Sequence, residues 1–196
     1  MYLSRLSMEI VDRGNQKVMV DGYRLHQMVM GGFKQYDGAE LGRVLFRLEP
    51  ETYGSIKHLL VQSRFIPDWS HLPASVLVES KPYVLHVSEG TVLSFRLRAN
   101  PVVTRDGKRR GLVREEAQAA WLLRKEIGVE WLDVSATDEG YVTGGKKGTH
   151  SIELKSVLFQ GHLMVVDAAK FQHAIADGIG PAKGFGFGML SLAGVR

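Results

Sequence analysis

Tyr23 and His26 are the side chains of this sequence whose types and spacing best suit acid–base chemistry. Residues three positions apart on a helix lie on one face, so the phenol and the imidazole can reach the same reacting group. An imidazole can remove a proton from a hydroxyl or give one to a leaving oxygen near neutral pH. A phenol can hydrogen-bond a phosphate or orient the hydroxyl. Such a pair can break RNA through its own 2′-hydroxyl without a metal, although a single helical histidine is more often a surface or core-edge residue.

A glycine-rich segment, GIGPAKGFGFG, runs from Gly178 to Gly188. Glycine allows positive φ and lets a phosphate approach bare backbone amides, with Lys183 available as a counter-charge. The spacing does not match a Walker loop, nor the GxGxxG pattern, because Lys183 takes the third glycine position. Nucleotide-cofactor binding is therefore disfavoured. A phosphate-binding loop and a tight turn between a helix and a strand both stay open.

Positive charge is concentrated in two stretches of a chain whose 25 basic and 21 acidic residues leave a net charge of +4. Lys146 and Lys147 stand among glycines 144, 145 and 148. Such clusters can bind the phosphates of a nucleic acid, or they can form a solvated face and a flexible loop. The other stretch, opposed only by Asp106, contains Arg96, Arg98, Arg105, Lys108, Arg109, Arg110 and Arg114.

Metal, thiolate and disulfide chemistry is not expected. The chain has no cysteine, and its seven histidines show neither HExxH nor the His-x3-5-His spacing of a zinc site. The sequence therefore predicts neither a metal nor a cofactor. No stretch approaches the roughly 18 apolar residues of a membrane span, and the start of the chain lacks an apolar signal region. We expect a cytoplasmic protein that does not associate with membranes.

The first half of the sequence predicts a βαββαβ pattern. Asp21 is a plausible N-cap for a helix whose apolar stripe includes Leu25 and Val29, with His26 one position off that stripe. A hairpin follows, with its turn at 50–54. The predicted strands are 2–10, 41–49, 55–63 and 83–87, with a short helix within 66–74.

The second half repeats the pattern from residue 90. Asp167 is the predicted cap of its last helix, and Gln160-Gly161 is the predicted turn of a hairpin. Two consecutive βαββαβ patterns indicate an α+β protein of two ferredoxin-like (RRM-like) domains, 1–89 and 90–196. The predicted strands are 91–99, 130–134, 151–159, 162–167 and 189–195, and the helices are about 114–127 and 168–177.

Taken together, the motifs resemble the CasE family, the repeat-processing endoribonuclease subunit of the type I-E CRISPR surveillance complex, Cascade. The resemblance covers essentially the whole chain. It rests on the order and spacing of MYLS at the start, Tyr23-x-Leu25-His26-Gln27, LVQS at 60–63, FRLRANP at 95–101, AWLLRK at 120–125, GIGPAK at 178–183 and GxGxLSLA at 186–193.

The resemblance implies a metal-independent enzyme that cuts precursor CRISPR RNA at the 3′ base of the repeat stem-loop. The 2′-hydroxyl attacks the adjacent phosphate, leaving a cyclic phosphate and a 5′-hydroxyl. His26 corresponds to the catalytic histidine, and Tyr23 to a companion that positions groups and stabilises charge. The chain is expected to be a monomer when isolated and to stay on the hairpin among the other Cascade subunits. The implied RNA-binding residues are Arg105, Lys108, Arg109, Arg110, Arg114, Lys146, Lys147, Gly178, Gly180 and Lys183.

Three features depart from the family's pattern: Met30 stands where tryptophan is frequent, the basic insert after Pro101 is short, and Gly184 and Phe187 alter the tail loop. Two alternative functions follow from the residues alone. A non-catalytic subunit that presents an RNA hairpin would bind RNA without cleavage that depends on the 2′-hydroxyl. A protein-interaction module would not bind a repeat hairpin at all.

Overall fold

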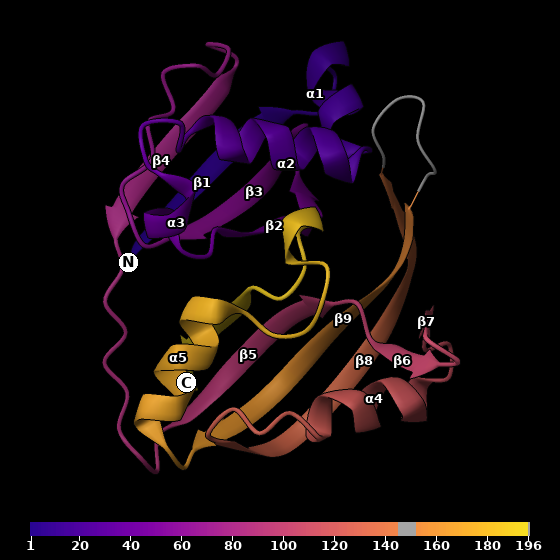
Figure 1. Ribbon diagram of the computed structural model, residues 1–196. Helices are drawn as coiled ribbons and strands as arrows, with labels where there is room; N and C mark the ends of the chain where they lie inside the picture. The colour runs from indigo at the N-terminus through magenta and orange to yellow at the C-terminus, as the bar shows by residue number, and fades with distance from the viewer. Residues whose placement is uncertain (145–151, 196) are drawn as a thin grey trace. The chain divides into compact units, whose positions relative to one another are not determined.

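The computed structural model describes residues 1–144 and 152–195, which belong to two compact units (Figure 1). The first unit comprises Met1–Val84, Val142–Glu153 and Lys183–Gly186. The second comprises Leu85–Tyr141, Leu154–Ala182 and Phe187–Arg196. The first unit thus includes two short segments from later in the chain, Val142–Glu153 and Lys183–Gly186. The domain limits 1–89 and 90–196 stay a prediction.

The first unit is built on a four-stranded antiparallel sheet with the order β2-β3-β1-β4. Leu6, on the central strand β1, pairs with Leu59 of β3 and Val78 of β4. This order is that of a ferredoxin-like sheet, which confirms the predicted fold class for this half. The elements are β1 Tyr2–Glu9, α1 Arg13–Met19, α2 Gly22–Gly31, α3 Gly38–Leu41, β2 Leu45–Tyr53, β3 Ile56–Ser63 and β4 Val76–Pro82.

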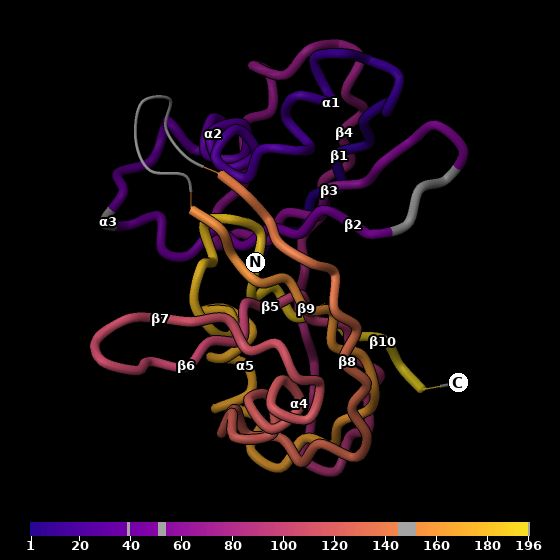
Figure 2. The backbone as a smooth tube through the Cα atoms, turned by 90° about the vertical axis from the view of Figure 1, so that its right-hand side faces the viewer, coloured from indigo at the N-terminus to yellow at the C-terminus, as the bar shows by residue number. Residues whose placement is uncertain are grey.

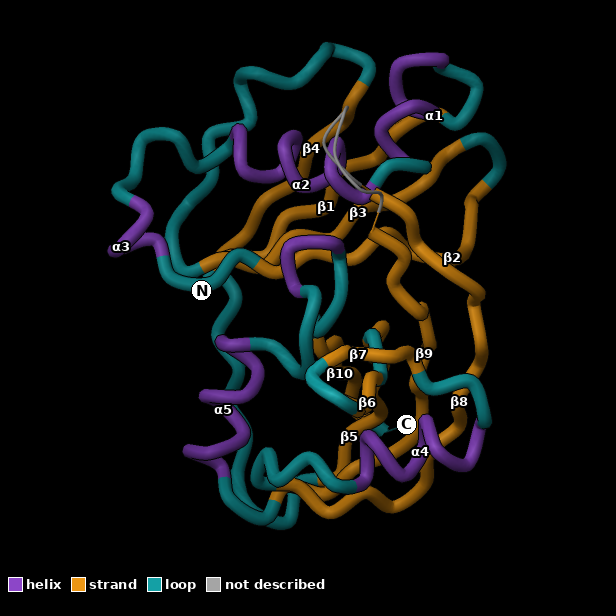
Figure 3. The backbone as a smooth tube through the Cα atoms, turned by 45° about the vertical axis from the view of Figure 1, so that its right-hand side comes forward, coloured by secondary structure: helices purple, strands orange, loops and turns teal. Residues whose placement is uncertain are grey.

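The closing part of this unit differs from the prediction. Residues 64–75 form no helix, and the closing strand is β4 rather than 83–87 (Figure 3). Pro67 and Pro73 account for the missing helix, because proline interrupts helical hydrogen bonding. Val76 is buried in the core and Leu77 is exposed, so β4 carries the alternation that pairs it with β1.

The second unit repeats the sheet order as β10-β5-β9-β8. Helices α4 and α5 cover one face of it, and their side chains Trp121, Leu122, Phe171 and Ile175 pack into one core with the strands. Its elements are β5 Val92–Ala99, β6 Val102–Arg105, β7 Lys108–Gly111, α4 Glu115–Leu123, β8 Val129–Gly144, β9 Ile152–Val165, α5 Ala168–Asp177, the short 3-10 turn η1 Lys183–Phe185 (which belongs to the first unit) and β10 Leu190–Gly194.

The hairpin predicted at Gln160-Gly161 is wrong, because β9 runs through both residues without interruption. Gln160 pairs with Arg96 and Gly161 with Phe95 in one continuous register with β5. A β-carbon on Gly161 would overlap the carbonyl oxygen of Asp133 on β8. Glycine is needed here for a close approach of two strands and not for a turn.

The short basic insert after Pro101 is a two-stranded ribbon made of β6 and β7, and it projects from the second unit (Figure 2). Asp106 and Gly107 form its turn with φ values of 51° and 71°. Two successive positive φ angles are the mark of a type I′ turn, which suits the twist of a tight hairpin. Among the described residues, no helix has the length and apolar character needed to cross a membrane.

Candidate active site

Helix α2 carries both predicted catalytic side chains. It begins at the predicted cap, because the carboxylate of Asp21 accepts hydrogen bonds from the amides of Tyr23 at 2.9 Å and Arg24 at 3.4 Å. Leu25 and Val29 are buried in the core of the first unit, which fixes the rotation of the helix about its axis. Tyr23 and His26 are therefore left half-buried at the edge of that core.

The turn η1 packs against this helix within the first unit (Figure 1). The ring of Phe185 lies so close to the backbone that a β-carbon on Gly22 or on Gly144 would be 3.0 Å from it. A β-carbon on Gly144 would also be 3.1 Å from the amide nitrogen of Tyr23. Phe185 thus occupies a slot that two glycines leave open beside the first turn of α2.

The preceding residue of the turn, Gly184, faces the candidate catalytic histidine. A β-carbon on Gly184 would be 3.5 Å from Nδ1 of His26. Nδ1 is buried, and no residue that the structure describes hydrogen-bonds to it. Proton exchange with a substrate through Nδ1 is therefore disfavoured in this arrangement.

This geometry constrains the protonation of His26. A base that acts through Nε2 carries its proton on Nδ1, and an acid that acts through Nε2 carries protons on both nitrogens. Both catalytic forms therefore place an N–H group at the buried edge of the ring, next to Gly184. A hydrogen-bond acceptor at this edge would favour both forms, because an unpaired buried donor is costly.

The remaining parts of the glycine-rich segment lie in the second unit. Gly178 follows α5 with a φ of 73°. Gly180 has a φ of 82°, and a β-carbon there would be 2.7 Å from the ring of Trp121. The amide of Ile179 bonds to the carbonyl of Gly188 at 2.9 Å. The interpretation as a tight turn therefore describes residues 178–182 well. Lys183, in contrast, lies in η1 and belongs with helix α2 to the first unit.

The ribbon β6–β7 displays four of the predicted RNA-binding cations, all of them exposed. Arg105 lies opposite Lys108, and Val103 lies opposite Arg110. Because side chains alternate along a strand and paired residues share a face, Arg105, Lys108 and Arg110 project from one face of the ribbon. Arg109, opposite Thr104, projects from the other.

The base of the ribbon is fixed to the second sheet. Gly111 lies against β9 so closely that a β-carbon there would be 2.7 Å from Cβ of Lys155. The buried ammonium of Lys155 pairs with Asp138 at 2.6 Å. This contact, followed by the amide of Gly140, lowers the pKa of the Asp138 carboxyl below its usual value. Gln118 of α4 donates to the carbonyl of Leu112 at 2.9 Å, just beyond the ribbon.

Other cations of the basic stretch have different environments. Arg114 is exposed at the start of α4 and makes no side-chain capping bond there. Arg98 forms a bidentate ion pair with Glu139, in which Nε and Nη2 donate to the two carboxylate oxygens at 2.7 and 2.8 Å. Its charge is therefore neutralised within the second unit. Lys146 and Lys147 lie outside the described residues, and their predicted RNA contacts stay a prediction.

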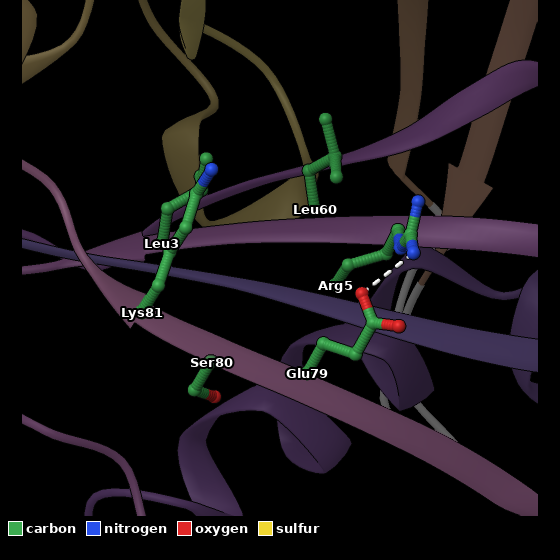
Figure 4. Close-up of a pocket in the computed structure, with 6 residues that line it drawn as sticks. All are labelled: Leu3, Arg5, Leu60, Glu79, Ser80 and Lys81. Carbon is green, nitrogen blue, oxygen red and sulfur yellow. Dashed lines mark hydrogen bonds and ion pairs between the residues drawn. The ribbon is translucent and has the colours of Figure 1, made fainter.

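A pocket of about 400 Å³ lies on the first sheet (Figure 4). Arg5 and Glu79 form an ion pair across β1 and β4 in it. It contains neither Tyr23 nor His26. Its lining residues are Leu3, Arg5, Leu60, Glu79, Ser80 and Lys81.

Sequence reasoning missed the role of Phe185. The residue lies more than 150 positions from helix α2, so no local pattern links the two. The available signal was an aromatic side chain between two glycines, in GFG at 184–186. An aromatic residue with bare backbone on both sides can insert where a larger neighbour would block it.

Comparison with known proteins places the chain among CRISPR proteins. Residues 1–194 match the family described as CRISPR associated protein. The CRISPR-associated endoribonuclease Cse3 of Thermus thermophilus is 29% identical over 210 aligned positions, which cover 98% of this chain and 100% of that protein. The CRISPR system Cascade subunit CasE of Escherichia coli is 32% identical over 210 positions, which cover 98% of this chain and 99% of that one.

The fold has a similar counterpart among solved structures. Thermus thermophilus Cse3, bound to an RNA representing a pre-cleavage complex, superposes with a TM-score of 0.90. The two chains are 29% identical, and the match covers 98% of each. This likeness agrees with the two ferredoxin-like sheets described above.

Proposed function

Because the chain belongs to the CRISPR associated protein family, we propose that it is an endoribonuclease that cuts the stem-loop of a CRISPR repeat RNA without a metal. The observation that carries this proposal is the placement of Tyr23 and His26 on one capped helix, with Nδ1 of the imidazole turned inward. The names of the relatives support the substrate class, since two of them are a CRISPR endoribonuclease and a Cascade subunit.

The reaction is an internal transesterification at the 3′ base of the stem. The 2′-oxygen attacks the adjacent phosphorus, and the bond from phosphorus to the 5′-oxygen breaks. The 2′-hydroxyl loses one proton and the leaving 5′-oxygen gains one, so the products are a 2′,3′-cyclic phosphate and a 5′-hydroxyl. His26 transfers a proton through Nε2, and Tyr23 hydrogen-bonds the phosphate and stabilises its developing charge.

The RNA is held by charges on the second unit and by η1. Arg105, Lys108, Arg109 and Arg110 of the ribbon, and Arg114 beside it, contact the phosphates of the stem. Lys146, Lys147, Gly178, Gly180 and Lys183 complete the proposed RNA-binding set. The protein acts in the cytoplasm and stays on the cut hairpin, where it joins other Cascade subunits.

The test is cleavage of a cognate repeat RNA in the presence of EDTA. We expect cutting to persist in EDTA and to stop when the nucleotide at the cut site lacks its 2′-hydroxyl. His26→Ala should cut at least about a hundredfold more slowly in a single turnover, because a general acid or base contributes about 10²- to 10⁴-fold to a rate. The variant should keep its affinity for RNA. His173→Ala, at an exposed histidine on α5, is the control and should cut normally.

Three results would redirect the assignment. Cutting by His26→Ala at the normal rate would remove the role of His26. Loss of cutting in EDTA, restored by a divalent cation, would contradict the metal-independent mechanism. Salt-sensitive RNA binding with no cutting by the wild-type protein would indicate the non-catalytic hairpin-binding subunit instead.

A further inference from the structure

The C-terminal end of helix α2 is held by a segment that follows β3. A helix leaves its last carbonyl groups without intrahelical partners. The amide of Gly32, which would reach Met28 in a continued helix, bonds instead to the carbonyl of Val29 at 3.1 Å. Gly32 itself has a φ of −74°, so the helix does not end in a left-handed glycine cap.

Two donors from that segment reach the end of the helix. Nε2 of His71 lies 3.1 Å from the carbonyl oxygen of Met28. The amide of Asp68 donates to the carbonyl of Gly32 at 2.8 Å. Because a carbonyl can only accept, Nε2 of His71 carries a proton in this contact. Its Nδ1 lies 3.3 Å from the carbonyl oxygen of Asp68. A neutral imidazole has one N–H and can donate to only one of these two carbonyls, and the contact with Met28 is the shorter.

Two glycines make this approach possible. A β-carbon on Gly31 would be 2.5 Å from Nε2 of His71, and one on Gly32 would be 2.7 Å from the ring of Trp69. The indole of Trp69 is anchored in turn, because its N–H lies 3.3 Å from the hydroxyl of Ser4 on β1. The end of α2 is therefore tied through the Trp69 and His71 side chains to the central strand of the first sheet.

We propose that His71 is a positioning residue for cleavage, because it holds the end of the helix on which Tyr23 and His26 lie. The proposal rests on the catalytic function proposed above. Helix α2 has ten residues, and a helix this short depends on contacts at its ends. The bonded carbonyl belongs to Met28, two residues after His26. Small displacements of a catalytic group reduce a rate strongly, whereas the ribbon belongs to the second unit and its charges do not change with the end of α2.

Two variants separate the hydrogen bond from the shape of the side chain. His71→Phe keeps an aromatic ring but removes the hydrogen-bond donor. His71→Gln restores an N–H group at about the same distance along the side chain. His71 is exposed, so neither change removes core packing. His173→Phe, at an exposed histidine on α5 in the second unit, is the matched control.

The first readout is hydrogen exchange in the peptide that covers α2, which requires no activity. We expect exchange of its amides to be about two- to tenfold faster in His71→Phe, the range that follows from the loss of one hydrogen bond. His71→Gln and His173→Phe should match the wild type. Unchanged exchange in His71→Phe would overturn the proposed contact.

The second readout separates binding from cutting on a cognate repeat hairpin. His71→Phe should bind RNA within about twofold of the wild type and should cut it about three- to tenfold more slowly in a single turnover, with the rate recovered in His71→Gln. Faster exchange together with a normal cutting rate would overturn the positioning role. A wild-type protein that binds the hairpin and does not cut it would contradict the proposed catalytic function, while the exchange result would still decide the contact.

Discussion

Gly184 lies against the imidazole of His26, at a distance that leaves room for one small side chain and no more. A β-carbon on residue 184 would be 3.5 Å from Nδ1, which is an ordinary van der Waals contact. The buried edge of the histidine therefore faces Gly184, and we expect a larger residue at this position to displace the ring.

Enlarging residue 184 tests this relationship. Gly184→Ala should cut RNA within about threefold of the wild type, because the new methyl group only touches the ring. Gly184→Leu should slow single-turnover cleavage by at least tenfold, because its branched side chain displaces the imidazole. RNA affinity should change little in both variants. Equal rates for the two variants would show that the turn yields and does not fix the ring.

The two faces of the ribbon β6–β7 should contribute unequally to RNA binding. Three single variants remove a cation from one face: Arg105→Ala, Lys108→Ala and Arg110→Ala. Each should weaken RNA binding and lower the magnitude of the slope of log affinity against log salt concentration by about 1, the value for one lost phosphate contact. Arg109 is the single ribbon cation on the opposite face, so its phosphate contact should contribute less and Arg109→Ala should have a smaller effect. Binding curves at several salt concentrations measure both quantities. Four equal losses would indicate that the ribbon inserts between phosphates on both sides.

Alanine substitutions at Gly140 and Gly180 separate the cost of a left-handed backbone from the cost of a steric overlap. Their φ angles are 83° and 82°, but a β-carbon on Gly140 meets no atom within 4 Å, whereas one on Gly180 meets Trp121 at 2.7 Å. Gly140→Ala should cost about 1 kcal/mol of unfolding free energy, the cost of a left-handed alanine. Gly180→Ala should cost at least about 1 kcal/mol more through the overlap. Urea unfolding measures the difference, and equal costs would mean that Trp121 moves aside.

The ion pair between Asp138 and Lys155 should make the stability of the second unit depend on pH in the acid range. Its pKa in the folded protein lies below the usual value of 3.8, chiefly because Lys155 hydrogen-bonds its carboxylate. A lowered folded-state pKa gives stability that is present above the unfolded value and is lost as the pH falls through the folded one. Asp138→Ala should therefore lower Tm at pH 7, where buried Lys155 loses its partner, and the difference from the wild type should shrink below pH 3.8.

Glu130→Gln, at an exposed carboxylate on β8, is the control for this prediction and should show no such trend. A constant difference in Tm between Asp138→Ala and the wild type across the whole pH range would contradict the ionic origin of the effect.

Local signals in the sequence were sufficient to predict helix α2. Asp21 is the cap that the sequence predicts, and the stripe of Leu25 and Val29 is buried as expected. The fold class is confirmed by the same sheet order in both units. Such features depend on neighbours within a few residues, or on the alternation of a strand, and both can be read from the chain directly.

Apart from the helix predicted within 66–74, which Pro67 and Pro73 interrupt, the failures arose where a distant contact decides the local structure. Gly161 has the local features of a turn, but it is a strand residue that the backbone of Asp133 approaches closely. The segment 83–87 alternates like a strand, yet β1 already pairs with β4 on that side. The contacts of His71 and Phe185 with α2 likewise join residues far apart in sequence, which periodicity does not reveal.

The membership of Lys183–Gly186 in the first unit has a consequence for biosynthesis. A ribosome that has made only the N-terminal strands and helices has not yet supplied Gly184 and Phe185. During translation, the slot beside Gly22 stays unfilled and the inner edge of the His26 ring stays uncovered until Gly184 and Phe185 have been made. A nascent chain can therefore complete the surroundings of helix α2 only after Phe185 has been added, more than 150 positions after the helix itself.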